Sequence, residues 1–300
     1  MGNVTSGGTN MSDFIIATAS TADLRNEWLE SHDIPFIPYT FEIEGEVFAD
    51  TCHSDLRHLI YRKMREGVMP NTSQITSYQY YEFFKGLVET GKPVIFADMD
   101  KAISGSYYNS TIAAGQIRED YPDAVLEVMD TRCITTGLGL LVRKMAYMRE
   151  DGHSFEEVLA WAKENQLKIV HRFLVDDLQW LRKGGRLSNA SSIVGSLLSI
   201  KPLIYLPDDG SLVAYEKVRG KKKALAQLLA SVKRDIDESY DREITLSHCD
   251  CLEEGRKWFE TVKENFPNAT IRLQELGPTI GSHIGPGFLS IVYFCDERRP

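Results

Sequence analysis

Several features of secreted, membrane-spanning and nucleic-acid-binding proteins are scarce in this sequence. Only five cysteines occur in 300 residues, and they are scattered at positions 52, 133, 249, 251 and 295. An odd, dispersed set gives no disulfide framework, which favours a reducing cytoplasm. No apolar run approaches the roughly 18 residues that a membrane-spanning helix needs. We therefore expect a cytoplasmic protein without stable membrane insertion.

The N-terminus and the charge balance exclude two further classes. Residues 1–12 are polar and glycine-rich, without the basic start and apolar stretch of a signal peptide, so we interpret them as a disordered lead-in or a cloning remnant. Lys and Arg number 34 against 43 Asp and Glu, a net charge of −9, which argues against nucleic acid as a partner. We interpret the basic run Lys217–Lys223 as a solvated helix start, and contact with an anion or a partner stays open.

What the sequence does contain is the composition of an ordinary globular protein, with 43% hydrophobic and 26% charged residues. Up to about residue 166, short apolar strands alternate with helical segments, which is typical of a parallel sheet covered by helices. Beyond that point strand-like runs dominate. We predict an α/β fold of two domains: an N-terminal parallel α/β domain over residues 13–166, and a C-terminal α+β domain with a mixed or antiparallel sheet over residues 167–300.

Three local predictions concern segments near the expected loops. Ser20 or Thr21 should cap a helix directly after the first strand. The stretch Ile34–Phe41 carries two prolines and should therefore be an edge strand. The segment Gly277–Gly287 is expected to be a loop constrained by its glycines and prolines.

Loops rich in hydroxyl and glycine residues follow the predicted parallel strands. They are Thr18–Thr21, Ile103–Ser106 and Asp130–Gly139, and a fourth, Asn71–Gln74, precedes another helix. Ligands of open parallel sheets bind at the carboxyl ends of the strands, and N–H groups and hydroxyls at helix starts suit an anionic oxygen group. The alternative is that these hydroxyls are only helix caps.

Two motifs in the C-terminal half add a cation and an imidazole. Arg182-Lys-Gly-Gly-Arg186 combines close backbone approach with a guanidinium, a bidentate partner for carboxylate or phosphate. His283 lies in the glycine- and proline-rich segment. Each has a simpler interpretation, a glycine C-cap with a solvated arginine and a structural hydrogen bond from the histidine. Gly137-Leu-Gly139 lacks the rest of a dinucleotide fingerprint and Cys249-Asp-Cys251 lacks a second pair of zinc ligands, so we predict neither cofactor nor metal.

Taken together, these segments resemble the DegV family of bacterial fatty-acid-binding proteins over nearly the whole chain. The order and spacing of several short motifs carry the resemblance. They are Ser20-Thr-Ala-Asp-Leu24, Thr72-Ser-Gln74, Ile103-Ser-Gly-Ser106, Leu181-Arg-Lys-Gly-Gly-Arg-Leu187, Ile200-Lys-Pro202, Lys217-Val-Arg-Gly220 and Ile280-Gly-Ser-His-Ile-Gly-Pro-Gly287.

The resemblance implies one long-chain fatty acid buried between two domains, with its carboxylate held by hydroxyls beside an arginine and a histidine. By motif position the implied ligand-binding residues are Thr72, Ser73, Ser104, Gly105, Arg186 and His283. It also implies a lipid-carrying subunit in phospholipid metabolism rather than an enzyme. Such a subunit presents the acid to a separate ATP-dependent fatty acid kinase catalytic subunit and needs no cofactor of its own.

The chain departs from the usual pattern of that family at three places. Ala19 stands where the first loop usually has an aspartate, and Ser106 stands where threonine is usual. Asp98 and Asp100 replace a serine-rich lead into the Ile103–Ser106 loop. Two carboxylates close to an acid-binding loop put the preferred acyl chain and the coupling to a kinase in question.

Elementary physical chemistry agrees with a lipid pocket. Burying a carboxylate is costly unless hydroxyls and a cation compensate it, whereas each buried methylene contributes roughly 0.8 kcal/mol. Seven apolar side chains could line the acyl tunnel or simply pack in the core. They are Ile193, Val194, Leu197, Leu198, Ile200, Leu203 and Ile204.

Two other functions are compatible with the sequence. A hydrolase or acyltransferase would use Ser104 as nucleophile and His283 as base, with Asp98 or Asp100 as the orienting acid. The absence of a Gly-x-Ser-x-Gly elbow counts against it. The other is a binding protein for a different anionic small molecule. The sequence contains no P-loop, so phosphoryl transfer is expected on a partner.

Overall fold

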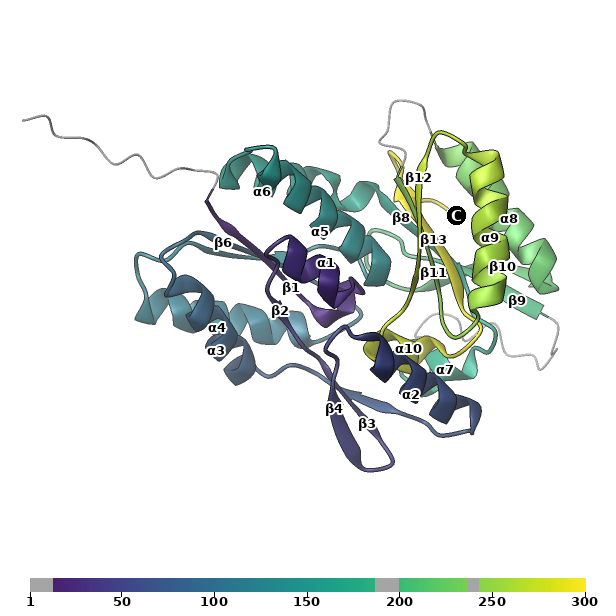
Figure 1. The fold of residues 1–300 in the computed structure, drawn as a ribbon, viewed down its shortest axis with the longest axis horizontal. Coiled ribbons are helices and arrows are strands. Elements are labelled where there is room, and N and C mark those ends of the chain that lie inside the picture. The colour runs from purple at the N-terminus through teal and green to yellow at the C-terminus, as the bar shows by residue number, and fades with distance from the viewer. Residues whose placement is uncertain (1–12, 187–199, 237–242) are drawn as a thin grey trace, which may run out of the picture.

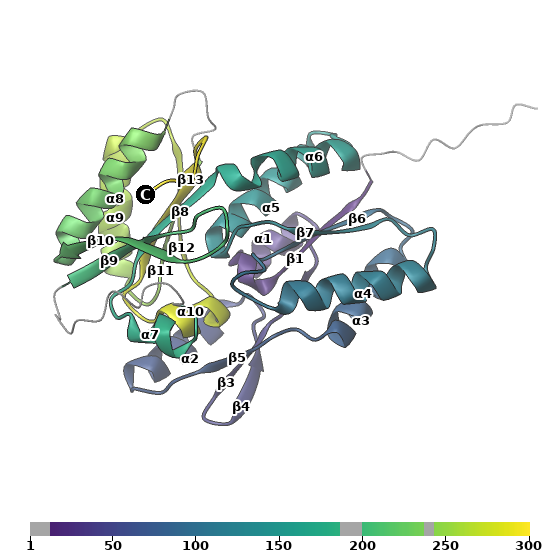
Figure 2. The same ribbon diagram turned by 180° about the vertical axis from the view of Figure 1, so that it is seen from behind.

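The chain folds into an α/β structure built on two large sheets and one small one, seen from opposite sides in Figures 1 and 2. The computed structural model describes residues 13–186, 200–236 and 243–300. The first sheet has parallel strands in the order β2-β1-β6-β7. These strands are β1 (Ile15–Ala19), β2 (Phe36–Ile37), β6 (Val94–Asp98) and β7 (Leu126–Asp130).

Helices cover both faces of this first sheet, because an all-parallel sheet must bury both. The helices α3 and α4 lie side by side on one face, and α5 and α6 lie on the other (Figures 1 and 2). All five residues of β6 are buried as a result. The helices of this part are α1 (Asn26–Ser31), α3 (Ser77–Val88), α4 (Ser106–Asp120), α5 (Thr135–Glu150) and α6 (Phe155–Asn165).

The second sheet is mixed, in the order β10-β9-β8-β13-β11-β12, with only β11 and β12 parallel to each other. The helices α8 (Lys221–Asp235) and α9 (Leu252–Asn265) cover its outer face (Figure 1). The strands are β8 (Ile169–Leu174), β9 (Ile200–Tyr205), β10 (Val213–Arg219), β11 (Glu243–His248), β12 (Thr270–Glu275) and β13 (Leu289–Phe294). Together the two sheets confirm the predicted fold class.

The helix α5 lies between the two large sheets and contacts both. Its first turns are buried on every side, which demands small residues where the backbone approaches its neighbours. A methyl group at Gly137 would lie 1.9 Å from Nε2 of His171, and one at Gly139 would lie 2.4 Å from the carbonyl oxygen of Ala22. The two glycines therefore permit close packing of α5. Farther along this helix, Arg143 donates a hydrogen bond from Nε to Glu243 on β11 over 3.1 Å.

A small antiparallel sheet and three helices, α2, α7 and α10, lie together at the lower side of the molecule in Figure 1. The strands are β3 (Thr40–Ile43), β4 (Glu46–Ala49) and β5 (Asn71–Ser73), in the order β4-β3-β5. The helices are α2 (Ser54–Arg65), α7 (Gln179–Lys183) and α10 (Pro278–Ile284), and two 3-10 turns are η1 (Ser20–Ala22) and η2 (Gln166–Lys168). The predicted domain boundary at residue 166 falls at η2 and stays a prediction.

The predicted helix cap at Ser20 or Thr21 is wrong. Both residues lie in η1, and the hydroxyl oxygen of Ser20 accepts a hydrogen bond from the backbone N–H of Tyr39 over 3.1 Å instead of capping a helix. Asp23 then adopts a left-handed conformation with φ of 53°, and α1 begins only at Asn26. A long-range contact has replaced the local cap.

Of three further predictions, two are confirmed in part, and the prediction of a loop at Gly277–Gly287 is wrong. The stretch Ile34–Phe41 does supply the edge strand β2, but it also enters β3 of the small sheet. The segment Gly277–Gly287 contains the helix α10 rather than only loop. Lys221, in the basic run, is not simply solvated, because its Nζ donates to the carbonyl oxygen of Gly287 over 2.9 Å and pairs with Glu254.

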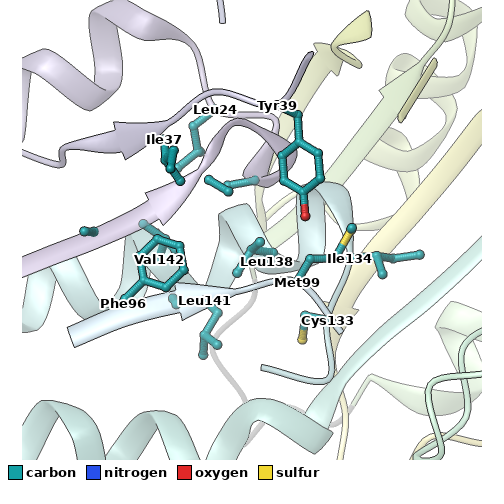
Figure 3. Close-up of a cluster of buried hydrophobic side chains, with 14 of the residues drawn as sticks. Leu24, Ile37, Tyr39, Phe96, Met99, Cys133, Ile134, Leu138, Leu141 and Val142 are labelled. Carbon is teal, nitrogen blue, oxygen red and sulfur yellow. The ribbon is translucent and has the colours of Figure 1, made fainter. Parts of the chain in front are cut away.

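The main hydrophobic core continues from the first sheet toward the second (Figure 3). Leu138, Leu141 and Val142 of α5 lie in it beside Phe96 of β6. Tyr39, Met99 and Ile134 lie at one edge of this cluster. The same three side chains also line a pocket, so the core and the pocket share a wall.

Candidate functional site

A pocket that is partly open to solvent lies between the carboxyl end of the first sheet and the inner face of the second. Most of the lining is apolar and comes from segments far apart in the sequence. These side chains are Met99, Ile103, Ile134, Phe173, Leu181, Leu212, Ile280, Ile284, Phe288 and Val292.

The pocket carries a hydrogen-bonded pair formed by Thr72 of β5 and His283 of α10. Thr72 Oγ1 and His283 Nε2 are 2.9 Å apart. Burial and the nearby Arg186 guanidinium lower the pKa of His283 to about 4. The imidazole is therefore neutral at pH 7, and it acts as a hydrogen-bonding group rather than as a cation. Its Nδ1 has no partner within the described residues.

Arg186 supplies a positive charge at the pocket, whereas Arg172, which also lines it, pairs with Asp235. Arg186 follows α7 and the turn at Gly184, whose carbonyl oxygen accepts from Nη1 over 2.5 Å, and Nε donates to the carbonyl oxygen of Ile103 over 3.4 Å. Within the described residues no carboxylate lies at ion-pair distance from the guanidinium. Burial lowers the pKa of Arg186, and an arginine nevertheless keeps its charge near neutrality.

Ser104 brings a hydroxyl from the loop before α4. Its Oγ lies 3.3 Å from the hydroxyl of Tyr39 and accepts from the backbone N–H of Ser106, also over 3.3 Å. The Ser106 hydroxyl is bonded in turn to the N–H of Ile75, which joins this loop to the segment after Thr72. The hydroxyls at the pocket are thus held in place by their neighbours.

The structure brings together four of the six residues implied by the sequence motifs. Thr72, Ser104, Arg186 and His283 all line the pocket. Ser73 is exposed and lies outside the lining, since neighbouring residues of a strand point to opposite faces. Gly105 also lies outside it; a methyl group there would lie 2.7 Å from the Gln74 side chain, so glycine permits close packing of two loops.

Seven polar residues of the lining were not singled out by the sequence analysis. Thr135 and Thr136 begin α5 within the Asp130–Gly139 segment, and Thr279 lies in the Gly277–Gly287 segment; both segments were noted only as a whole. For the other four the sequence contained no local signal, because long-range packing brings them to the pocket. They are Tyr39, His171, Arg172 and Ser290.

The residues that depart from the family pattern do not line the pocket. Asp98 is fully buried and accepts hydrogen bonds from Tyr80, Ser110 and the N–H of Met99. The carboxylate of Asp100 packs against Gly210, because a methyl group on Gly210 would lie only 2.2 Å from it. Ala19 ends β1. All three have structural roles in the first sheet and its loops.

The proposed tunnel residues also lie away from the pocket lining or outside the described chain. Ile193, Val194, Leu197 and Leu198 lie outside the described residues. Ile200, Leu203 and Ile204 are on β9, and none of the three lines the pocket. Leu203 packs under α8 and α9, which is the core alternative considered for these side chains.

The geometry does not support a Ser–His–Asp triad. The Ser104 hydroxyl is bonded to Tyr39 and Ser106, whereas His283 is bonded to Thr72. A triad also needs an acid on the other ring nitrogen. Within the described chain, Nδ1 of His283 has no such partner, and Asp98 and Asp100 are enclosed elsewhere.

The described part of the chain offers neither a metal-binding cluster nor a membrane-spanning helix. Across residues 13–186, 200–236 and 243–300, no three His, Cys, Asp or Glu side chains are grouped so that they could hold a metal ion. In the same ranges, no helix combines the length and the apolar character needed to cross a bilayer. The five cysteines have free thiols.

Comparison with known proteins gives consistent matches over almost the whole chain. The model of an uncharacterised protein family, the DegV family, matches residues 13–296. A DegV domain-containing protein of Clostridium perfringens is 37% identical over 291 residues, which covers 97% of this chain and 100% of that protein. A DegV domain-containing protein of Lactococcus lactis is 32% identical and covers 95% of this chain and 99% of its own length.

Solved structures match as well. A DegV family protein of Thermus thermophilus, described by its fatty acid binding, is 25% identical with a TM-score of 0.85 and covers 94% of this chain and 99% of its own. A stearic-acid-binding protein of Eubacterium ventriosum is 26% identical with a TM-score of 0.83 and covers 93% and 98%. The fatty-acid-binding protein DegV of Bacillus subtilis is 25% identical with a TM-score of 0.83 and covers 94% and 99%.

Proposed function

The chain belongs to the DegV family, and from this premise we propose that it binds one long-chain fatty acid in the pocket between the two sheets. The observation that carries the proposal is the composition of the pocket, an apolar interior with Thr72, Ser104, Arg186 and His283 in its wall. Related proteins of known structure are described as fatty-acid-binding, which supports the same ligand class.

The carboxylate head group is expected at the polar part of the wall. The Ser104 hydroxyl can donate one hydrogen bond to it, the Thr72–His283 pair can donate a second, and the guanidinium of Arg186 offsets its charge. The acyl chain then lies against the apolar side chains, where each methylene contributes roughly 0.8 kcal/mol. Direct contact with Ser73 or Gly105 is not part of this proposal, because both lie outside the lining.

The proposal includes presentation of the bound acid to a separate ATP-dependent fatty acid kinase subunit, with no cofactor and no catalytic step on this chain. This part rests on the family resemblance. Partial exposure of Thr72, Arg186 and His283 supports it, because the head group would then be within reach from outside the protein. On this view the protein is a cytoplasmic carrier.

The first test is mass spectrometry of an organic extract from the purified protein, followed by titration of the delipidated protein with oleic or palmitic acid. We expect one fatty acid per chain. Arg186→Ala should weaken binding roughly 10- to 100-fold, since it removes a charged hydrogen-bond donor worth about 1.5–3 kcal/mol. Arg118→Ala, an exposed position on α4, is the matched control. An empty extract together with no uptake of either acid would contradict the proposal.

A further inference from the structure

Hydroxyl groups in the pocket wall are paired with one exception. Six lining hydroxyls have a partner: Tyr39 with Ser104, Thr72 with His283, Thr135 with the N–H of Thr136, Thr279 with Asp50, and Ser290 with Ser247. The hydroxyl of Thr136 has no hydrogen-bond partner within the described residues, although the residue is fully buried. It also lines the pocket.

A second unpaired polar atom lies on the adjoining element. His171 of β8 lines the pocket and is 2% exposed, and its Nδ1 has no hydrogen-bond partner within the described residues. Its Nε2 is hydrogen-bonded to the backbone of Ile134: it lies 3.3 Å from the nitrogen and 3.2 Å from the carbonyl oxygen of that residue. The ring also packs on Gly137, directly beside Thr136. Both residues therefore line the pocket where β8 meets the start of α5.

The hydroxyl of Thr136 and Nδ1 of His171 both need a hydrogen-bonding group on the ligand. An unsubstituted alkyl chain against them would leave both unpaired, and each unpaired buried group costs about 1–3 kcal/mol. Burial lowers the pKa of His171 to about 3, so the ring is neutral, and its Nδ1 is a donor or an acceptor depending on the tautomer. An alcohol is both donor and acceptor, so it suits either tautomer and also the Thr136 hydroxyl.

We propose that this part of the pocket is a subsite for a hydroxyl group on the acyl chain, with Thr136 and His171 as its partners. The preferred ligand class is then a long-chain hydroxy fatty acid. This inference rests on the proposed fatty-acid-binding function and refines it. A purely apolar pocket discriminates poorly against an added hydroxyl, whereas a site built to bond one rejects the analogue that lacks it.

The test compares octadecanoic acid with a series of hydroxyoctadecanoic acids that differ in the position of the hydroxyl, titrated into the delipidated full-length protein. At least one isomer should bind about tenfold more tightly than octadecanoic acid, the effect of one additional satisfied hydrogen bond. Thr136→Val should remove that preference and bind octadecanoic acid more tightly than the natural protein does. Thr111→Val, on α4 with its hydroxyl bonded to Tyr108, should keep the natural ratio.

The possible outcomes distinguish failure of the hydroxyl subsite from failure of fatty acid binding itself. Tight binding of octadecanoic acid with no preferred hydroxy isomer overturns the subsite and leaves fatty acid binding intact. A preference that survives in Thr136→Val overturns the assignment to this residue. If no acid of either kind binds, the proposed function fails and the subsite fails with it. The comparison of ligands on the natural protein does not depend on how well any variant folds.

Discussion

Asp98, at the end of β6, shows how a single carboxyl group is stabilised inside the first sheet. It has no exposed surface, and its Oδ2 accepts from Tyr80 and Ser110 while its Oδ1 accepts from the N–H of Met99. Burial raises its pKa to about 7 in spite of these bonds. The aspartate that departs from the family pattern is thus a titrating group within the fold rather than part of the pocket.

Asp98→Asn should flatten the pH dependence of stability. In the folded protein the proton is held up to about pH 7, whereas the unfolded chain loses it near the ordinary value of 3.8. The natural protein therefore loses stability as the pH rises from about 4 to 7, by up to roughly 4 kcal/mol. An asparagine amide can donate to the Ser110 oxygen in place of the protonated carboxyl, and the Ser110 hydroxyl then donates to the carbonyl oxygen of Tyr107 over 2.7 Å.

Urea unfolding at pH 5 and pH 8 measures this effect. The free energy of unfolding of Asp98→Asn, relative to the natural protein, should be higher at pH 8 than at pH 5. Asp123→Asn, on an exposed turn, is the control and should leave the difference unchanged. Parallel pH profiles for Asp98→Asn and the natural protein would show that the carboxyl is not held protonated.

At the scale of elements, the contact between α7 and α10 positions the imidazole of the pocket. Gly184 ends α7, and a methyl group there would lie 2.4 Å from Nδ1 of His283. Gly184→Ala should therefore push the ring away from Thr72 and weaken fatty acid binding about tenfold, the loss of one hydrogen bond. Its backbone φ of −71° suits alanine, so strain in the turn itself is not expected.

Titration with oleic acid checks this prediction, with Gly86→Ala as the matched control. Gly86 lies within α3, and a methyl group there meets nothing within 4 Å. The control should keep the natural affinity and gain up to about 1 kcal/mol of stability, because alanine favours the helix. Unchanged affinity in Gly184→Ala would mean that the position of His283 does not matter for the ligand.

Local patterns predicted the regular elements well and their partners poorly. The alternation of strands and helices gave the parallel sheet, since each element has its own periodicity. Ser20 was expected to cap a helix, but it bonds instead to Tyr39, 19 residues away, and no local pattern encodes that contact. The helix α10 could have been found, because Pro278 in the first turn and Gly285 after the last are helix-end signals.

The same reasoning applies to the pocket. Thr72, Ser104, Arg186 and His283 stand in recognisable motifs, and their placement in one site was implied by the family resemblance that these motifs carry. His171 carries no such motif. It reaches the pocket because β8 of the second sheet lies beside the first turn of α5, and the sequence pattern does not specify this contact.

At the scale of the whole molecule, the two large sheets share one core and one pocket. The main core contains Ile16 and Phe96 from the first sheet together with Phe173 and Val292 from the second. Two buried carboxylates strengthen this connection: Asp23 accepts from the N–H of Gly277, and Asp50 accepts from the hydroxyl of Thr279. These contacts argue that the two halves unfold together rather than independently.

A ligand held by both sheets should stabilise both at once, so removing the lipid should lower the melting temperature without splitting the transition. Saturation at 100 times the dissociation constant contributes about 2.7 kcal/mol, which corresponds to roughly 4 °C for a chain of 300 residues. Differential scanning calorimetry of the loaded and delipidated protein measures the shift. Methyl octadecanoate, which lacks the charge that Arg186 would bind, should restore much less of it than octadecanoic acid. Two separate transitions in the delipidated protein would show that the shared core does not couple the two sheets without the ligand.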